Sequence, residues 1–143
     1  MKLVISQADV DLLVEHARRE APAEACGYLA GPRVDGDEPR AVAKVYPMAN
    51  IEEPARREIR YRMEPKEQFE AMKDMRVHGW DVVGTYHSHP ESQAHPSGID
   101  IDLAFDPVAL YVIVSLAEAS NPDIRAYSIV DGRVEEAHVS IEG

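Results

Sequence analysis

The sequence has little cysteine and no long apolar run. Its one cysteine, Cys26, has no partner for an internal disulfide. No stretch approaches the roughly 20 consecutive apolar residues that a helix needs to cross a bilayer. Residues 1–5 lead directly into a predicted strand and lack the layout of a signal peptide. Together these absences predict a cytoplasmic protein.

Basic residues are also scarce. The chain has 15 Lys and Arg against 26 Asp and Glu, which gives a formal net charge of −11. Nucleic acids and anionic membranes both attract basic surfaces, so we expect neither as a partner. Only four of the 15 basic residues are lysine, which fits either adaptation to high salt or an arginine-biased codon usage. Neither interpretation bears on function.

Repeats, linkers and low-complexity tracts are absent too. A length of 143 residues suits one domain of ordinary size, and 45% hydrophobic residues suffice for a core without disulfide support. We therefore expect residues 1–143 to form a single domain of the mixed α/β class.

Periodicity and turn signals locate the expected elements. Strands are predicted at residues 3–5, 24–30, 41–47, 59–63, 80–87, 109–116, 124–130 and 133–140, and helices at 7–20, 67–78 and 97–105. Ser6 is the expected N-cap of the first helix, and Asp131-Gly132 predicts a type I′ hairpin turn. The expected buried side of the second helix consists of Phe69, Met72, Met75 and Arg76.

The stretch over residues 85–100, Thr-Tyr-His-Ser-His-Pro-Glu-Ser-Gln-Ala-His-Pro-Ser-Gly-Ile-Asp, contains three possible metal ligands. His87 ends a predicted strand and His89 follows two residues later, so in extended conformation both imidazoles face the same side. Asp100 falls in the first turn of the following helix. Two imidazoles and one carboxylate, with a fourth position open to water, are typical of a catalytic zinc site.

Each part of this pattern has a simpler explanation when taken alone. A His-x-His pair is common on ordinary strands, and Ser97-x-x-Asp100 reads as a helix capping box. Cys26 is expected to be a small packing residue rather than a nucleophile. His16, His78 and His138 are expected at the surface or at element ends.

The complete pattern resembles the JAMM (MPN+) family of zinc metalloproteases, along essentially the whole chain. It has an upstream glutamate, then His-Ser-His-Pro, then a serine and an aspartate at fixed spacing; the matching residues are Glu24, His87, Ser88, His89, Pro90, Ser97 and Asp100. The resemblance implies a three-layer, cytidine deaminase-like architecture, in which helices flank a central mixed sheet.

The resemblance also implies a role for each residue. One Zn²⁺ per chain would be bound by His87, His89 and Asp100. Glu24 would act as general base and acid, and Ser97 would donate a hydrogen bond to the oxyanion. Three further residues are candidates for substrate contact, namely Ser88, His95 and Arg60.

Arg60 belongs to a basic cluster that has two interpretations. The other members of the cluster are Arg56, Arg57 and Arg62. Salt bridges to Glu52, Glu53, Glu58 and Glu64 are the favoured explanation. The alternative is a rim that meets an acidic partner or a substrate carboxylate.

The small prokaryotic members that the chain resembles act on ubiquitin-like, β-grasp sulfur-carrier proteins. One mycobacterial type releases cysteine from the carrier's C-terminus. The implied reaction is hydrolysis of the amide bond after a C-terminal glycine, with the carrier as partner and the oligomeric state open. Other interpretations are a peptidase for cell-wall or phage-tail peptides, a non-catalytic MPN-type scaffold, and a zinc deaminase, which would need a Cys-x-x-Cys pair that one cysteine cannot supply.

Overall fold

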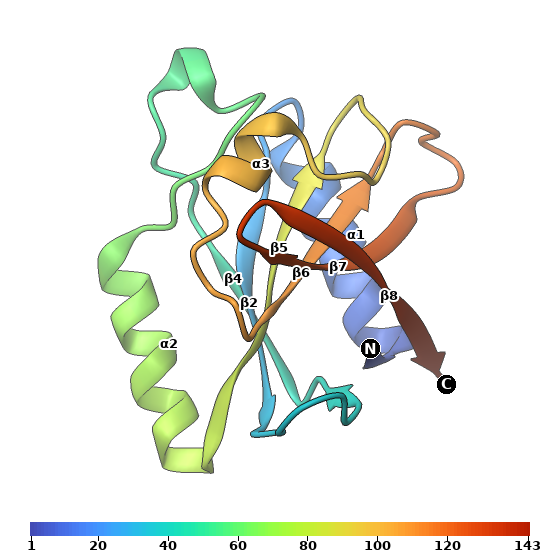
Figure 1. Ribbon diagram of the computed structural model, residues 1–143. Coiled ribbons are helices and arrows are strands. Elements are labelled where there is room, and N and C mark those ends of the chain that lie inside the picture. Colours follow the sequence, from blue (N-terminus) through green and yellow to red (C-terminus); the bar gives the residue numbers. More distant parts are fainter.

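A computed structural model describes residues 1–143 as a mixed sheet with helices on both faces (Figure 1). The eight strands are ordered β3-β1-β8-β7-β6-β5-β2-β4. The elements are β1 (Lys2–Ser6), α1 (Gln7–Glu20), β2 (Cys26–Pro32), β3 (Arg40–Ala41), β4 (Lys44–Met48), the 3-10 turn η1 (Pro54–Arg56), α2 (Pro65–His78), β5 (Trp80–His89), α3 (Gly98–Asp102), β6 (Leu110–Ser115), β7 (Asp123–Val130) and β8 (Arg133–Glu142).

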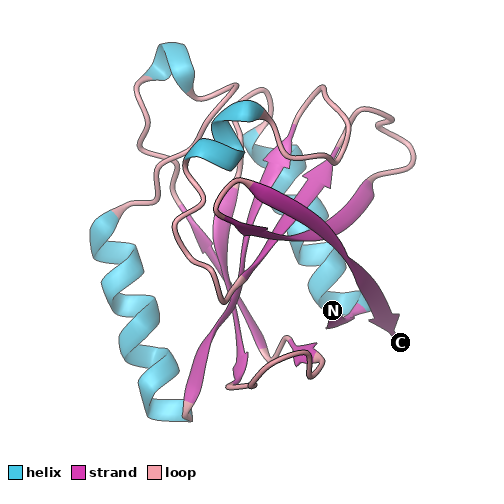
Figure 2. Ribbon diagram, viewed as in Figure 1, coloured by secondary structure: helices cyan, strands magenta, loops and turns pink.

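Packed side chains cover both faces of the sheet, which makes the fold three-layered. Helix α1 buries Leu13 and Ala17 against one face, where Leu29 of β2 lies. The neighbouring Tyr28 points the opposite way and packs with Met75 of α2. Figure 2 shows the two long helices on opposite sides of the strands. The expected α/β class, with a central mixed sheet flanked by helices, is confirmed.

The helices begin and end at residues whose local chemistry specifies those ends. The hydroxyl of Ser6 accepts a hydrogen bond from the Asp9 N–H at 3.1 Å, so the predicted N-cap of α1 is confirmed. Helix α2 starts with Pro65, which lacks the N–H that a first turn leaves unpaired. It ends at Gly79, whose φ of 72° lies in the left-handed region that favours glycine.

The last hairpin also forms as expected. Strands β7 and β8 pair in antiparallel fashion, with Val130 opposite Arg133. Asp131 and Gly132 between them have φ values of 50° and 75°, the positive sign that a type I′ turn requires at both positions. No helix of this chain has the length and apolar character that crossing a membrane requires.

Three expected elements differ from the structure. Strand β2 begins at Cys26, so Glu24 lies in the loop before it rather than on a strand. Residues 59–63 form no strand, and only a single bridge joins Asn50 to Met63. Helix α3 ends at Asp102, short of residue 105, because Leu103 leaves the helical conformation there.

Two predictions of burial are wrong. Helix α2 buries Ala71 and Met75, so Met75 is confirmed, whereas Phe69 and Met72 are 61% and 45% exposed and Arg76 is exposed as well. The small Ala71 side chain, four residues before Met75, forms the stripe along which the helix meets the sheet. His16 is also buried, because it shares the inward stripe of α1 with Leu13 and Ala17, and its Nδ1 lies 2.8 Å from the Tyr86 hydroxyl.

A candidate metal and active site

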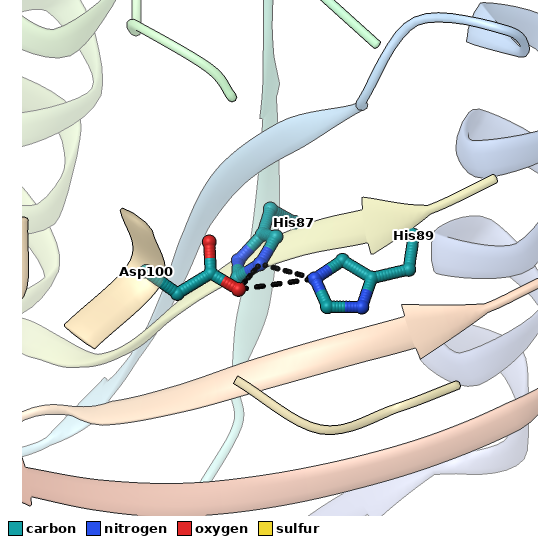
Figure 3. A group of neighbouring side chains, drawn as sticks. All are labelled: His87, His89 and Asp100. Carbon is teal, nitrogen blue, oxygen red and sulfur yellow. Dashed lines mark hydrogen bonds and ion pairs between the residues drawn. The ribbon is translucent and has the colours of Figure 1, made fainter. Parts of the chain in front are cut away.

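The strand β5 and the helix α3 bring three possible metal ligands together. Strand alternation turns His87 and His89 to the face opposite Tyr86, at the end of β5. Asp100, in the first turn of α3, points at both imidazoles (Figure 3). The three side chains are only 2%, 4% and 5% exposed. The structure therefore places these three residues in one buried cluster.

The cluster has the geometry of a metal-binding site. The two Nε2 atoms of His87 and His89 lie 3.2 Å apart. The Asp100 Oδ2 lies 3.1 Å from the Nε2 of His87 and 3.0 Å from that of His89. A tetrahedral ion with bonds of about 2.1 Å separates its ligands by about 3.4 Å. The triangle of donor atoms is thus close to the size that a small divalent cation requires.

Hydrogen bonds behind the cluster orient its donor atoms. The Nδ1 of His89 lies 2.7 Å from the Gln93 carbonyl oxygen, so the ring N–H donates there and the Nε2 lone pair faces Asp100. The His87 Nδ1 has no hydrogen-bond partner, and its ring stacks on Tyr61 at 5.0 Å between centroids. Lone pairs that face one another at 3 Å repel unless a proton or a cation lies between them. The residues therefore fit a metal ion.

Asp100 is fixed by the predicted capping box. Its Oδ2 accepts a hydrogen bond from the Ser97 N–H at 2.9 Å, and its own N–H donates to the Ser97 Oγ at 3.1 Å. Burial raises the pKa of Asp100, but hydrogen bonds outweigh it and hold this pKa well below the usual range; they come from the Ser97 backbone N–H and, when their rings are protonated in the absence of a metal, from His87 and His89. Asp100 is therefore ionised at neutral pH, as a metal ligand must be.

Glu24 lies beside the cluster, on the loop between α1 and β2. It is 3% exposed, and its Oε1 has no hydrogen-bond partner. Burial, aided by the negative charge of Asp100 and opposed by His89, raises the pKa of Glu24 to about 8. A carboxyl group with a pKa near neutrality can both accept and return a proton, as a general acid and base must.

Backbone contacts from two other segments hold Glu24 in place. Its N–H donates to the Arg57 carbonyl at 2.7 Å, and its carbonyl accepts from the Asn50 side-chain amide at 3.0 Å. The next residue, Ala25, donates its N–H to the Ser88 hydroxyl at 2.7 Å and accepts from the Ser88 N–H at 3.0 Å. The position of Glu24 is therefore set by β5 and by the loop that follows β4.

Asn50 is a site residue that our sequence reasoning missed. Its amide nitrogen also donates to the Arg60 carbonyl at 3.2 Å, and its Oδ1 accepts from the N–H groups of Glu52 and Arg62, both at 3.1 Å. The side chain thus ties the residue 50–62 loop to Glu24. No periodicity or motif distinguishes Asn50 from the other polar residues of this loop, so the sequence carries no signal for it.

A cleft of about 540 Å³ opens beside the cluster. Its lining includes Glu24, His89 and Ser97. The Ser97 Oγ accepts the capping hydrogen bond from Asp100, which leaves its own hydroxyl proton free to donate to a bound group. One serine can therefore cap α3 and present a donor to the cleft.

The three candidates for substrate contact lie in different surroundings. Ser88 is fully buried on the other face of β5, where it holds Ala25, so it has no access to a substrate. Arg60 forms an ion pair with Glu52 at 3.0 Å, which agrees with the salt-bridge interpretation. His95 is exposed, with its ring edge 5.8 Å from the Tyr127 ring, and it lines a separate cavity of about 690 Å³.

Cys26 and the remaining histidines of the sequence analysis take no visible part in the cluster. Cys26 is fully buried behind His87, with which it pairs across the sheet. Burial, and then the negative charge of Glu24, raise the pKa of its thiol to about 12, which leaves it unreactive near neutral pH. His78 stacks on Trp80 at the end of α2, and His138 is exposed.

Comparisons with known proteins place this arrangement in a family. The family described as prokaryotic homologs of the JAB domain matches residues 6–130. The CysO-cysteine peptidase of Mycobacterium tuberculosis is 40% identical over 139 residues, which cover 97% of this chain and 90% of that protein. The desampylase of Haloferax volcanii is 38% identical over 109 residues, which cover 73% of this chain and 74% of that protein.

A solved structure agrees with these relatives. The solution structure of a protein from Desulfitobacterium hafniense superposes with a TM-score of 0.86, at 39% identity, and covers 99% of this chain and 93% of that one. Together with the geometry of Glu24 and the His-His-Asp cluster, the match along nearly the whole chain shows that the protein belongs to the prokaryotic JAB-domain family of JAMM-type hydrolases.

Proposed function

We propose that the protein is a zinc-dependent peptidase or isopeptidase that hydrolyses the amide bond after the C-terminal glycine of a small ubiquitin-like or sulfur-carrier protein. The observation that carries this proposal is the shared cleft of Glu24, His89 and Ser97. A proton-transferring carboxyl, a metal-ligand cluster and a hydrogen-bond donor are the groups that amide hydrolysis requires.

Zinc suits the donor set of the cluster. His87, His89 and Asp100 would hold it, and two imidazoles with one carboxylate are typical ligands of catalytic zinc. Zinc bound there would supply Lewis acidity, which lowers the pKa of water and polarises a carbonyl. We propose one ion per chain.

The residues of the chain would then perform the proton transfers. Glu24, as a carboxylate, would take a proton from the attacking water and deliver it to the leaving amine as the carbon–nitrogen bond breaks. Its raised pKa suits both directions of transfer near neutral pH. The Ser97 hydroxyl would donate to the oxygen of the attacked carbonyl, where negative charge develops.

Burial of the ligands supports a glycine beside the scissile bond. The exposed fractions of the three ligand side chains do not exceed 5%, so the residue next to the scissile bond must approach a deeply covered cluster, which favours one without a side chain. A tail ending in glycine meets this requirement. The names of the two relatives, a peptidase for CysO-cysteine and a desampylase, support a carrier-type substrate.

The proposal is tested by incubating the zinc-loaded protein with carrier–cysteine and carrier–lysine conjugates and following their intact masses. We expect cleavage after the terminal glycine, its loss on chelation, and its return with added zinc. Undiminished cleavage after complete removal of metal would contradict the zinc assignment. Absence of cleavage by the zinc-loaded protein would favour the scaffold alternative.

A further inference from the structure

The cleft beside the cluster carries charge of one sign. Its lining includes three acidic residues, Glu24, Glu58 and Glu91, and the raised pKa of Glu24 leaves Glu58 and Glu91 as the two charged ones at neutral pH. Its only other ionisable residue is His89, and no lysine or arginine lines it. Glu58 and Glu91 are exposed and form no ion pair with a basic side chain. No basic side chain in the cleft therefore offsets their negative charge, and the one cation beside it would be the proposed zinc ion at His89.

A second, independent observation indicates that a ligand group enters this cleft. The Oε1 of Glu24 is buried and accepts no hydrogen bond, although buried carboxylate oxygens are nearly always paired. A donor from a bound molecule would satisfy it. An N–H group of a leaving amine is such a donor.

The proton transfer assigns one part of the substrate to the cleft. Hydrolysis adds the hydroxyl of water to the carbonyl carbon and its proton to the nitrogen, and the carbon–nitrogen bond breaks. Under the proposed function Glu24 delivers that proton, which places the leaving amine on the Glu24 side, in the cleft lined by Glu58 and Glu91.

Basic residues lie outside this cleft. Arg60 and Arg62 line a different groove, together with Met72 of α2 and Phe105 after α3, and Arg60 also borders a small hollow beside His87 and Asp100. A carboxylate on the leaving group would therefore meet carboxylates without an arginine to bind it, although arginine is the usual partner of carboxylates in binding sites.

We propose that this cleft selects leaving groups by charge, and that its preferred leaving group is a lysine side chain in a neutral or basic segment of a protein. A free amino acid, whose carboxylate adjoins the scissile nitrogen, is disfavoured. The inference rests on the proposed function and names the leaving group for the same site.

Three substrates with one common acyl peptide, which ends in Gly-Gly, test the inference. The first is joined to cysteine with a free carboxylate, the second to cysteine amide, and the third to the lysine ε-amine of a short basic peptide. We expect kcat/KM to be about tenfold higher for the amide than for the acid at low salt, and highest for the lysine conjugate. Since exposed charges are screened, the ratio should shrink at about 1 M salt.

Variants test whether Glu58 and Glu91 cause the preference for the amide substrate over the acid. The double variant Glu58→Gln, Glu91→Gln should reduce the amide-to-acid ratio to about threefold or less. Glu53→Gln is the matched control, because Glu53 is 73% exposed, pairs with Arg56 and lies outside the cleft. It should keep the ratio of the unmodified protein. All three residues are exposed, so each variant should fold, which thermal unfolding will verify.

The outcomes separate the inference from the proposed function. Equal rates for acid and amide, or a ratio that the double variant leaves unchanged, would overturn the inference while cleavage itself upholds the proposed function. A zinc-loaded protein that cleaves none of the three substrates would overturn the proposed function, and the inference with it.

Discussion

The side-chain amide of Asn50 donates a hydrogen bond to the backbone carbonyl of Glu24 over 3.0 Å. This contact joins the loop after β4 to the loop before β2, outside the motif that supplies the metal ligands. The placement of the proposed acid and base therefore depends on a residue that neither touches substrate nor ligates metal.

Replacing Asn50 with alanine should lower kcat more than it raises KM. The change removes the hydrogen bond to the Glu24 carbonyl and the bonds by which Asn50 fixes its own loop, and a displacement of about 1 Å at a reacting group costs on the order of a hundredfold in rate. Zinc content should stay near one per chain, because the three ligands lie elsewhere. Asn121→Ala, at an exposed position, is the control. Unchanged kcat in Asn50→Ala would refute this positioning role.

Glu24 should make the metal-free protein less stable as pH rises. Burial and the Asp100 charge raise its pKa from 4.5 to about 8, so between these values the folded state holds a proton that the unfolded state has lost. The free energy of unfolding then falls with pH by an amount on the order of 5 kcal/mol over this window.

Glu24→Gln isolates this contribution. The variant cannot titrate at this position, so its stability relative to the unmodified protein should rise from pH 5 to pH 8 in chemical denaturation with chelator present. If the free energies of unfolding of the two proteins changed in parallel across this pH range, the raised pKa of Glu24 would be contradicted.

His87→Ala should abolish metal binding. It removes one of three donors from a cluster whose atoms lie 3.0 to 3.2 Å apart, and two donors bind zinc far more weakly than three. Elemental analysis should find about one zinc in the unmodified chain and little in the variant. His138→Ala, at an exposed site, should retain its zinc. A variant His87→Ala that still binds one zinc per chain would show that His87 is not a zinc ligand.

Ser97→Ala should lower both activity and stability. Loss of an oxyanion donor costs about a hundredfold or more in kcat, and loss of an N-cap costs about 1 kcal/mol. Ser6→Ala removes a comparable cap from α1, far from the metal ligands in sequence, and gives the matched control. It should lose stability without losing activity. If both variants lose stability but keep their activity, Ser97 acts only as the N-cap of α3.

The sequence predicts those parts of the site that depend on local geometry. His87 and His89 face one side because strand residues alternate, and Ser97 and Asp100 form a capping box because their spacing allows it. The long helices follow from their caps and periodicity in the same way.

The remaining features depend on tertiary packing, which no local pattern records. Glu24 lies in a loop held by Arg57 and Asn50, which are distant in sequence and belong to no regular element. The buried stripe of α2 depends on how closely that helix meets the sheet, which the small Ala71 permits. His16 is different, because its place beside Leu13 and Ala17 on the α1 stripe could have been read from the sequence.

The most direct test of the account compares the hydrolysis of a Gly-Gly-lysine conjugate by the unmodified protein and by Glu24→Gln, at matched zinc content. Because the ligand cluster does not include Glu24, the variant should bind one zinc per chain. It should cleave at least about a hundredfold more slowly, since it cannot transfer the proton. Full activity in the zinc-loaded variant would contradict the assignment of Glu24 as general acid and base.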